Sequence, residues 1–280
     1  MSSFASLAAS WIETSFPMPP SSRPLALNPR DIFRVWLRYF AVFRKSLLYG
    51  VTVTVTQPLL FLLAFGFGLA SLIPGVDYRG VELGYREFVF AGIIAQALLL
   101  QGYFEGAFGS FVRMYYQRVF QSVAVTPVTL REVLWAELLW DASRASFSAL
   151  VIAGIGSALG ILDPWSWLRL VPVVVVGGLT FSALGVLSAA FARTIEELNY
   201  PQYFLVFPMF VFCGIFYPIA NLPVWIQPVV QLLPLAGLAD LVRSITLGLP
   251  FQWGSLTVLL VWFVVLVPAA HRAMTRRLVK

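Results

Sequence analysis

The stretch of residues 47–73 carries no charged side chain and is long enough to cross a membrane as a helix. An α-helix rises about 1.5 Å per residue, and the hydrocarbon core of a bilayer is about 30 Å thick. Residues 51–56 alternate Val and Thr as a strand would, but an isolated strand in lipid leaves its backbone N–H and C=O groups unbonded. We therefore predict a spanning helix in which the Thr hydroxyls bond to backbone carbonyls, with a bend at Pro58.

The rest of the chain has the same apolar character. Of the 280 residues, 59% are hydrophobic and 11% are charged, whereas soluble domains carry roughly 25% charged residues. The apolar runs predict an all-α integral membrane protein in which residues 47–280 form one domain. Its six transmembrane helices are expected at residues 47–73, 88–112, 145–162, 170–192, 203–219 and 253–270.

The distribution of Lys and Arg predicts the orientation of these spans. Cationic residues concentrate in loops that stay in the cytoplasm. All but four of the 19 Lys and Arg residues fall on the side that holds both termini, and the exceptions are Arg79, Arg86, Arg169 and Arg243. Both termini are therefore expected to be cytoplasmic, and residues 1–28 are interpreted as a cytoplasmic tail, because they show no signal-peptide pattern.

Residues 29–46 have the pattern of an amphipathic helix lying in the membrane interface. Phe33, Trp36 and Phe40 recur at helical spacing, while Arg30, Arg34 and Arg38 follow one another on a neighbouring face. Two interpretations stay open at this point. The helix is either an anchor held by anionic lipid or a part of a channel entrance.

The segment of residues 113–135 is too polar to cross the membrane and too apolar to be a free loop. Pro127 disfavours helix in the preceding residue and fits the first turn of a following helix, with Thr126 or Thr129 as the cap. We predict a short helix, a break at Thr126-Pro127 and a second helix entering the next span. Such a cytoplasmic elbow is a handle for a partner protein, and the alternative is an ordinary amphipathic connector.

The stretch of residues 220–250 is apolar but is interrupted by proline, so no single helix runs through it. Two half-length helices, at about residues 224–232 and 235–248, are expected to form an external re-entrant hairpin. Non-helical backbone at membrane depth requires protein or a water-filled cavity around it. Asp240 and Arg243 lie three residues apart on one helical face, which favours an ion pair over substrate contact.

Charged and small residues near the cytoplasmic ends of the spans were interpreted as structural. Glu105 is expected at the inner end of the second span, beside glycines that suggest close helix contact. The inner acids are expected to form salt links with Arg131 and Arg144 rather than to act in catalysis; they are Glu132, Glu137, Asp141, Glu196 and Glu197.

Several chemistries find no support in the sequence. Lys occurs only at positions 45 and 280, so the phosphate-binding Gly-x-x-x-x-Gly-Lys-Ser/Thr loop is absent and the chain cannot hydrolyse ATP by that route. A lone Cys213 and a lone His271 predict neither a disulfide nor a metal site. We expect no cofactor in this chain and no nucleic-acid partner.

The chain resembles the permease subunits of type-two ABC exporters, and most closely the permeases that export nodulation factors, which are lipo-oligosaccharides. The likeness rests on the 118–132 elbow with Thr126-Pro127-Val128, on Glu137 and Trp140, and on the 214–218, 222–223, 233–235 and 240–243 segments. It implies an exporter in the bacterial inner membrane that works as a dimer of permeases in membrane lipid. A separate cytoplasmic ATPase subunit would bind ATP and Mg.

The resemblance also implies roles for particular residues. The ATPase contact would include Arg118, Thr126, Pro127 and Glu132. The external hairpin would include Pro218, Pro223, Trp225, Asp240 and Arg243. Aromatic residues of the fifth span and its exit, Phe204, Phe207, Phe216 and Tyr217, are candidates for lining the pathway, since aromatic faces stack on sugar rings and acyl chains.

Three alternatives remain beside an exporter of amphiphilic glycans. A drug or lipid exporter would have the same architecture. An enzyme acting on lipid-linked sugars would need clustered acids, His or Arg at one membrane face, which the sequence does not show. A secondary transporter would show two repeated halves with paired broken helices.

Overall fold

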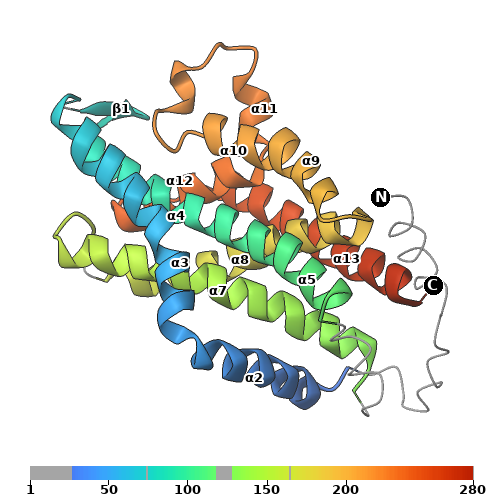
Figure 1. Cartoon of the computed structure of the whole chain (residues 1–280). Helices are drawn as coiled ribbons and strands as arrows, with labels where there is room; N and C mark the ends of the chain where they lie inside the picture. Colours follow the sequence, from blue (N-terminus) through green and yellow to red (C-terminus); the bar gives the residue numbers. More distant parts are fainter. Residues whose placement is uncertain (1–26, 74, 118–127, 164, 280) are drawn as a thin grey trace, which may run out of the picture.

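The protein is largely helical, and the computed structural model describes residues 27–73, 75–117, 128–163 and 165–279. Figure 1 shows long helices packed side by side, with a small hairpin of two strands at one end. We call this end the hairpin end, and the end at which residues 117 and 128 lie the elbow end.

The described chain begins with two helices joined at a sharp corner. Helix α2 (Pro29–Lys45) starts at Asn28, whose side chain accepts a hydrogen bond from the Arg30 N–H at 3.1 Å. Helix α3 (Leu47–Phe61) continues into the wider turns of η1 (Leu62–Gly68) and the short η2 (Leu69–Ser71). Thr54 and Thr56 bond back to the carbonyls of Gly50 and Thr52, as predicted for the Val-Thr segment.

A two-stranded antiparallel hairpin follows, of β1 (Val76–Tyr78) and β2 (Val81–Leu83). It is an exception to the predicted all-α fold. Its turn residues Arg79 and Gly80 both have positive φ, at 57° and 77°, as a two-residue turn between twisted strands requires. The polar residues of this segment had predicted a loop.

The second long helix runs from the hairpin end to the elbow end. It consists of α4 (Tyr85–Phe104), η3 (Glu105–Gly109) and α5 (Ser110–Tyr115). Most of α4 is fully buried, including Phe88, Phe90 and Leu99 at 0% exposure. This helix is therefore the core of the bundle.

Two long helices pack beside α4. Helix α7 (Leu130–Ala158) begins well before the predicted third span at 145–162, because Thr129 and Glu132 form a capping box at its start. Helix α8 (Ser166–Phe191) contacts α4, α7 and the last helix, α13 (Trp253–Val279).

The predicted fifth span is interrupted. Helical backbone extends through η4 (Glu196–Leu198), α9 (Asn199–Pro201), η5 (Gln202–Val206) and α10 (Phe207–Phe212). It ends before Gly214, which has φ +73°. At about 1.5 Å per residue, this helix is shorter than the ~30 Å hydrocarbon core.

Short helices then lead to the last span. They are η6 (Ile219–Asn221), α11 (Gln227–Gln231) and α12 (Pro234–Thr246). Two half-length helices were predicted here, and α11 and α12 are those helices. Helix α12 is almost entirely buried and packs on α4, α8 and α13.

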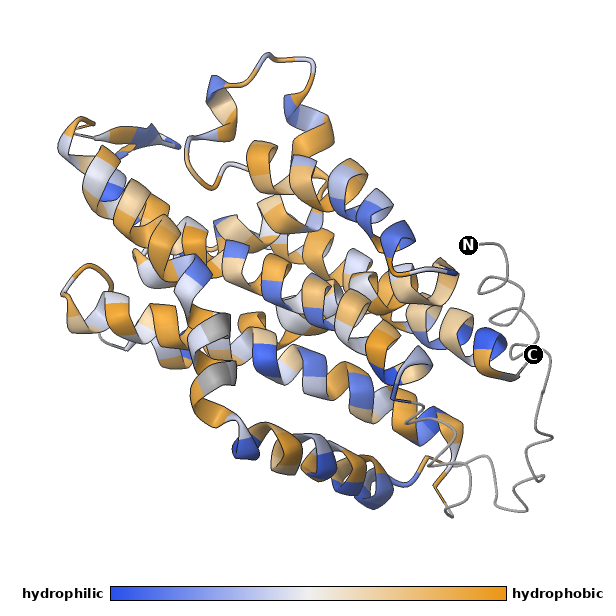
Figure 2. Ribbon diagram, viewed as in Figure 1, coloured by the Kyte–Doolittle hydropathy of each residue, from blue (hydrophilic) through white to orange (hydrophobic). Residues whose placement is uncertain are grey.

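Five helices of the described chain are long and apolar enough to span a membrane. They cover Gly50–Ser71, Tyr85–Tyr115, Leu130–Ala158, Ser166–Phe191 and Trp253–Leu278. Figure 2 shows these helices as mainly hydrophobic, whereas α2 alternates hydrophilic and hydrophobic bands. The predicted spans other than 203–219 therefore match helices of the structure.

The contact of η3 with α8 is so close that only glycine fits on either side. A Cβ atom added at Gly106 would lie 2.4 Å from the Ser182 carbonyl oxygen, and one added at Gly185 would lie 2.4 Å from the Tyr103 carbonyl oxygen. This bears out the close helix contact predicted from the glycines near Glu105.

We predict that Gly185→Ala lowers the thermal midpoint of the detergent-solubilised protein, because overpacking of a tight interface costs about 1–3 kcal/mol. The matched control is Gly154→Ala in α7, where an added Cβ would meet nothing within 4 Å. Equal midpoints for the two variants would contradict the proposed close contact.

Candidate functional site

The most unusual feature of the bundle is a set of five charged side chains buried at its elbow end. We call this set the elbow-end cluster: Glu105, Arg113, Glu137, Asp141 and Arg144. Glu105 and Arg113 belong to the η3–α5 segment, and the other three belong to α7. Glu137, Asp141 and Arg144 follow one another at intervals of four and three positions, so they share one face of α7.

Arg113 is the centre of the cluster. Its guanidinium donates to Glu137 at 2.5 Å, to Asp141 at 2.7 Å and to Glu105 at 2.9 Å. Ser110 adds a hydrogen bond from its hydroxyl to Glu137 at 2.8 Å. The three donor nitrogens therefore cross-link two helices through carboxylates of which two, Glu137 and Asp141, have fully buried side chains.

Arg144 extends the cluster to the first spanning helix. Its guanidinium pairs with Glu105 and donates to the Thr54 hydroxyl on α3 at 3.2 Å. The Ser148 hydroxyl donates to the Thr54 carbonyl at 3.1 Å. The cluster thus connects α3, η3–α5 and α7 at one level of the bundle.

Helix α2 closes the cluster from the outside. Trp36, Tyr39 and Phe43 surround the Trp140 ring of α7, with centroid distances of 5.7–6.1 Å. The guanidinium of Arg113 lies 5.6 Å from the centre of the Tyr39 ring. Helix α2 is therefore docked on the same part of α7 that carries the charges.

The charges of the cluster do not balance. Three carboxylates face two guanidiniums, and burying an unpaired charge is costly. Burial and the neighbouring Glu137 carboxylate raise the pKa of Tyr39, so its hydroxyl stays protonated beside Glu137. Neutralising one acid would leave two charges of each sign.

A second polar cluster lies at the hairpin end, around Asp240 of α12. Its carboxylate accepts hydrogen bonds from Arg79 at 2.7 Å, from Ser255 at 3.1 Å and from the Tyr78 hydroxyl. Burial raises the pKa of Tyr78 to about 12, so its hydroxyl stays protonated and donates at neutral pH. The β1–β2 hairpin is thereby tied to α12 and α13.

Arg243 is fully buried beside this cluster. It donates to the Gly214 carbonyl at 2.5 Å, and its guanidinium lies 3.8 Å from the centre of the Phe88 ring. Its nearest approach to Asp240 is 4.0 Å. The predicted mutual neutralisation of Asp240 and Arg243 is therefore weak, because Arg79 takes the stronger contact with the carboxylate.

Of the residues predicted at the ATPase contact, the structure describes Glu132 alone. Arg118, Thr126 and Pro127 lie outside the described residues. Glu132 is buried at the start of α7, where it bonds to Thr129 and accepts a hydrogen bond from the Asn28 N–H at 2.9 Å. It therefore fixes the start of α2 to the start of α7.

The residues predicted for the hairpin and the pathway differ in how exposed they are. Pro218 is buried at the start of η6, whereas Pro223 and Trp225 are exposed. Phe204 and Phe207 are 80% and 56% exposed. Phe216 instead packs against Phe61, Phe65 and Phe210, and the Tyr217 hydroxyl donates to the Val211 carbonyl at 3.0 Å.

The elbow-end cluster was not predicted from the sequence. Glu105 was predicted at the interface and the inner acids in salt links with Arg131 and Arg144, whereas Glu105 is 11% exposed and Arg113 pairs with Glu105, Glu137 and Asp141. Arg144 plays part of its expected role, since it pairs with an acid, Glu105. The spacing of Glu137, Asp141 and Arg144 was an available signal for a polar face buried in a helix.

Taken together, the fold and its sites define a polytopic helical membrane protein with an amphipathic helix docked at one end and charged clusters within the bundle. Residues 30–247 match the model of the ABC-2 type transporter family. The chain belongs to this family, whose members are transport permeases.

Individual proteins support the assignment. The chain is 31% identical to Nodulation protein J of Rhizobium meliloti (strain 1021), over 81% of this chain and 85% of that protein. It is 32% identical to Nodulation protein J of Rhizobium leguminosarum bv. viciae, over 77% and 82%. It is also similar to the inner membrane transport permease YadH of Escherichia coli (strain K12), at 23% identity over 72% and 77%.

We predict that one substitution in the elbow-end cluster is damaging and another is tolerated. Arg113→Met leaves three buried carboxylates without their shared partner, and breaking such contacts costs about 3–5 kcal/mol, so folded protein should be largely lost. Glu137→Gln keeps the shape and balances the charges, so its thermal midpoint should stay near that of the wild type. The charge argument is wrong if Glu137→Gln is as damaging as Arg113→Met.

Proposed function

We propose that this chain is the membrane subunit of an ATP-driven exporter whose ATP is hydrolysed, with Mg, by a separate cytoplasmic subunit. The observation that carries the proposal is the cross-link made by Arg113. It joins α5 to α7, the two helices that flank the 113–135 elbow. A force applied to the elbow is therefore passed to both helices together rather than lost in a flexible loop.

Two further contacts support this role of the elbow. Glu132 bonds both to the start of α7 and to the Asn28 N–H at the start of α2. Arg144 connects the cluster to α3. Movement at the elbow would thus reach the interfacial helix and three spans, as a coupling between ATPase and transport pathway requires.

The proposed topology has six crossings and both termini in the cytoplasm of the bacterial inner membrane. Five crossings are the long apolar helices. The sixth consists of the Asn199–Pro201, η5 and α10 helices together with the backbone up to Pro218. The 220–250 segment then returns as a re-entrant hairpin at the external face.

The proposed cargo is an amphiphilic glycan, a lipo-oligosaccharide or another lipid-linked molecule. The relatives named for nodulation and the resemblance to lipo-oligosaccharide permeases favour this class. The interior of one chain is filled by α4, while Phe204 and Phe207 face outward. We therefore place the pathway between two copies of the permease, in contact with lipid. A drug or lipid is the alternative cargo.

The orientation is testable by labelling single cysteines in a Cys213→Ala background. Glu82→Cys, on the exposed part of β2, should react with a membrane-impermeant maleimide in intact cells. Ser122→Cys, within the elbow, should react only after the membrane is opened or in inverted vesicles. Labelling of Ser122→Cys in intact cells would contradict both the topology and the ATPase contact.

The coupling role is testable in vesicles that contain the permease and its ATPase subunit. Coupling free energies are typically about 1–3 kcal/mol, so replacing Arg118 or Pro127 should lower export about 5- to 150-fold while ATP hydrolysis and membrane insertion persist. Glu196→Gln is the matched control, because Glu196 is exposed near the elbow end and outside the cluster. Normal export with both Arg118 and Pro127 altered would rule out the elbow as the joint.

A further inference from the structure

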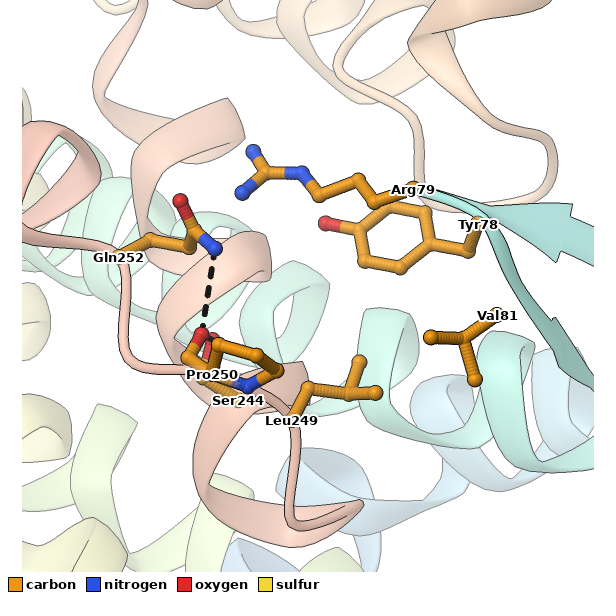
Figure 3. A pocket seen from close by; sticks show the side chains of 7 residues that line it. All are labelled: Tyr78, Arg79, Val81, Ser244, Leu249, Pro250 and Gln252. Atoms are coloured by element: carbon orange, nitrogen blue, oxygen red, sulfur yellow. Dashed lines mark hydrogen bonds between the residues drawn. The ribbon is translucent and has the colours of Figure 1, made fainter.

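A small cavity opens beside the hairpin-end cluster. Its volume is about 130 Å³, and its walls come from β1, β2, α12 and the connection from α12 to α13. Figure 3 shows the side chains of Arg79 and Tyr78 extending side by side from the hairpin toward Gln252. Neither the elbow mechanism nor the proposed orientation uses this cavity.

Two guanidiniums and one carboxylate adjoin the cavity. Asp240 is one carboxylate between two guanidiniums, those of Arg79 and Arg243. The hairpin also carries Asp77 and Glu82, which lie opposite each other in the strand register, and the Asp77 carboxylate accepts a hydrogen bond from the Gly80 N–H at 2.9 Å. Because side chains alternate along a strand, Asp77 and Glu82 occupy the face opposite to Tyr78 and Val81, which line the cavity.

Asp240 itself has little remaining capacity to bind a cation. Its two oxygens already accept from Tyr78, Arg79 and Ser255. Arg79, by contrast, donates through a single nitrogen to the described residues, and 45% of its side chain is exposed. An arginine fork has five N–H donors, so most of them remain available to a ligand in the cavity.

A second donor and an apolar wall complete the site. The Gln252 side-chain amide bonds to the Pro250 carbonyl at 3.2 Å and keeps another N–H. Val81, Leu249 and Pro250 supply the apolar wall. An arginine fork, an amide and an apolar surface together suit an oxyanion attached to an organic group.

We propose that this cavity binds a phosphate-type oxyanion, with Arg79 and Gln252 as its donors. The same chemistry is presented by the head group of an anionic phospholipid and by a soluble phosphate. The site binds the anion without breaking the Arg79 contact with Asp240, because the guanidinium fork serves both.

Binding is measured on the full-length protein in a neutral detergent. One arm titrates inorganic phosphate against chloride at equal ionic strength and follows the thermal midpoint. The other arm adds mixed phosphatidylglycerol and phosphatidylcholine and counts retained lipid by native mass spectrometry. Neither arm uses ATP or cargo, so the outcome is separate from that of the export assays.

Wild-type protein should bind the anion in at least one arm, and Arg79→Gln should weaken that binding roughly tenfold or more. Arg169→Gln is the matched control, since Arg169 is an exposed arginine paired with an aspartate, Asp163, in the connection at the same end. It should bind as the wild type does. Response to phosphatidylglycerol alone identifies a lipid head group, and response to inorganic phosphate identifies a soluble anion.

Gln252→Leu tests the site independently if Arg79→Gln misfolds. Gln252 bonds to the Pro250 carbonyl rather than to Asp240, so its loss leaves the contacts of Asp240 in place. It should weaken binding while leaving the hairpin in place, and Arg79→Lys should bind with intermediate affinity. The proposal is overturned if wild-type protein binds neither anion, or if Arg79→Gln and Gln252→Leu bind as tightly as Arg169→Gln.

Discussion

The arrangement of the bundle depends on one guanidinium, that of Arg113, which holds carboxylates from two helices within a largely apolar interior. Ions are expensive to bury, so these charges stabilise the fold only when all the contacts form together. That requirement fixes the rotation and the register of α7 against the η3–α5 segment. Apolar contacts alone would leave several helix registers close in energy, because lipid solvates apolar side chains as well as the bundle does.

The helix that carries Arg113 is shaped to make these contacts. The wider turns of η3 begin at Glu105, and such π-type turns often mark functional positions in helices. Gly109 leaves the space for the ions, since a Cβ added there would lie 3.0 Å from an Arg113 nitrogen and 3.1 Å from a Glu105 oxygen. The packing of glycine against α8 and the ion cluster are thus two consequences of one short, glycine-rich stretch.

The sequence predicted those features that depend on local composition. Hydropathy identified five spans, the Thr54 and Thr56 back-bonds follow from the need to satisfy hydroxyls in lipid, and Thr129 was one of two predicted caps. Features that depend on distant segments were missed. Arg113 and Asp141 lie in different predicted segments, and nothing local shows that their helices meet. The predicted start of the third span at residue 145 also left Glu137 and Asp141 outside the membrane.

Two backbone features were also missed because they depend on contacts with distant segments. Hydropathy runs on through residues 203–219, but Gly214 adopts positive φ and the helix ends before it. Arg79-Gly80 is not one of the usual Asn-Gly or Asp-Gly hairpin turns, and strands of three residues are too short to show a period. Each feature permits a contact with a distant residue. The Gly214 carbonyl accepts a hydrogen bond from Arg243, and the hairpin places Tyr78 and Arg79 beside Asp240.

The two polar clusters act on opposite ends of the same helix. Arg243 bonds at the start of α4, where it lies on the Phe88 ring, and Arg113 belongs to the continuation of that helix at the elbow end. Between them α4 is packed on all sides, with residues such as Ile93 and Leu98 at 0% exposure. A close-packed helix of this kind moves as a unit rather than bending locally. Displacement of the elbow in the proposed exporter would therefore be felt at the hairpin end, where α12 and the β1–β2 hairpin are tied to the other end of the helix.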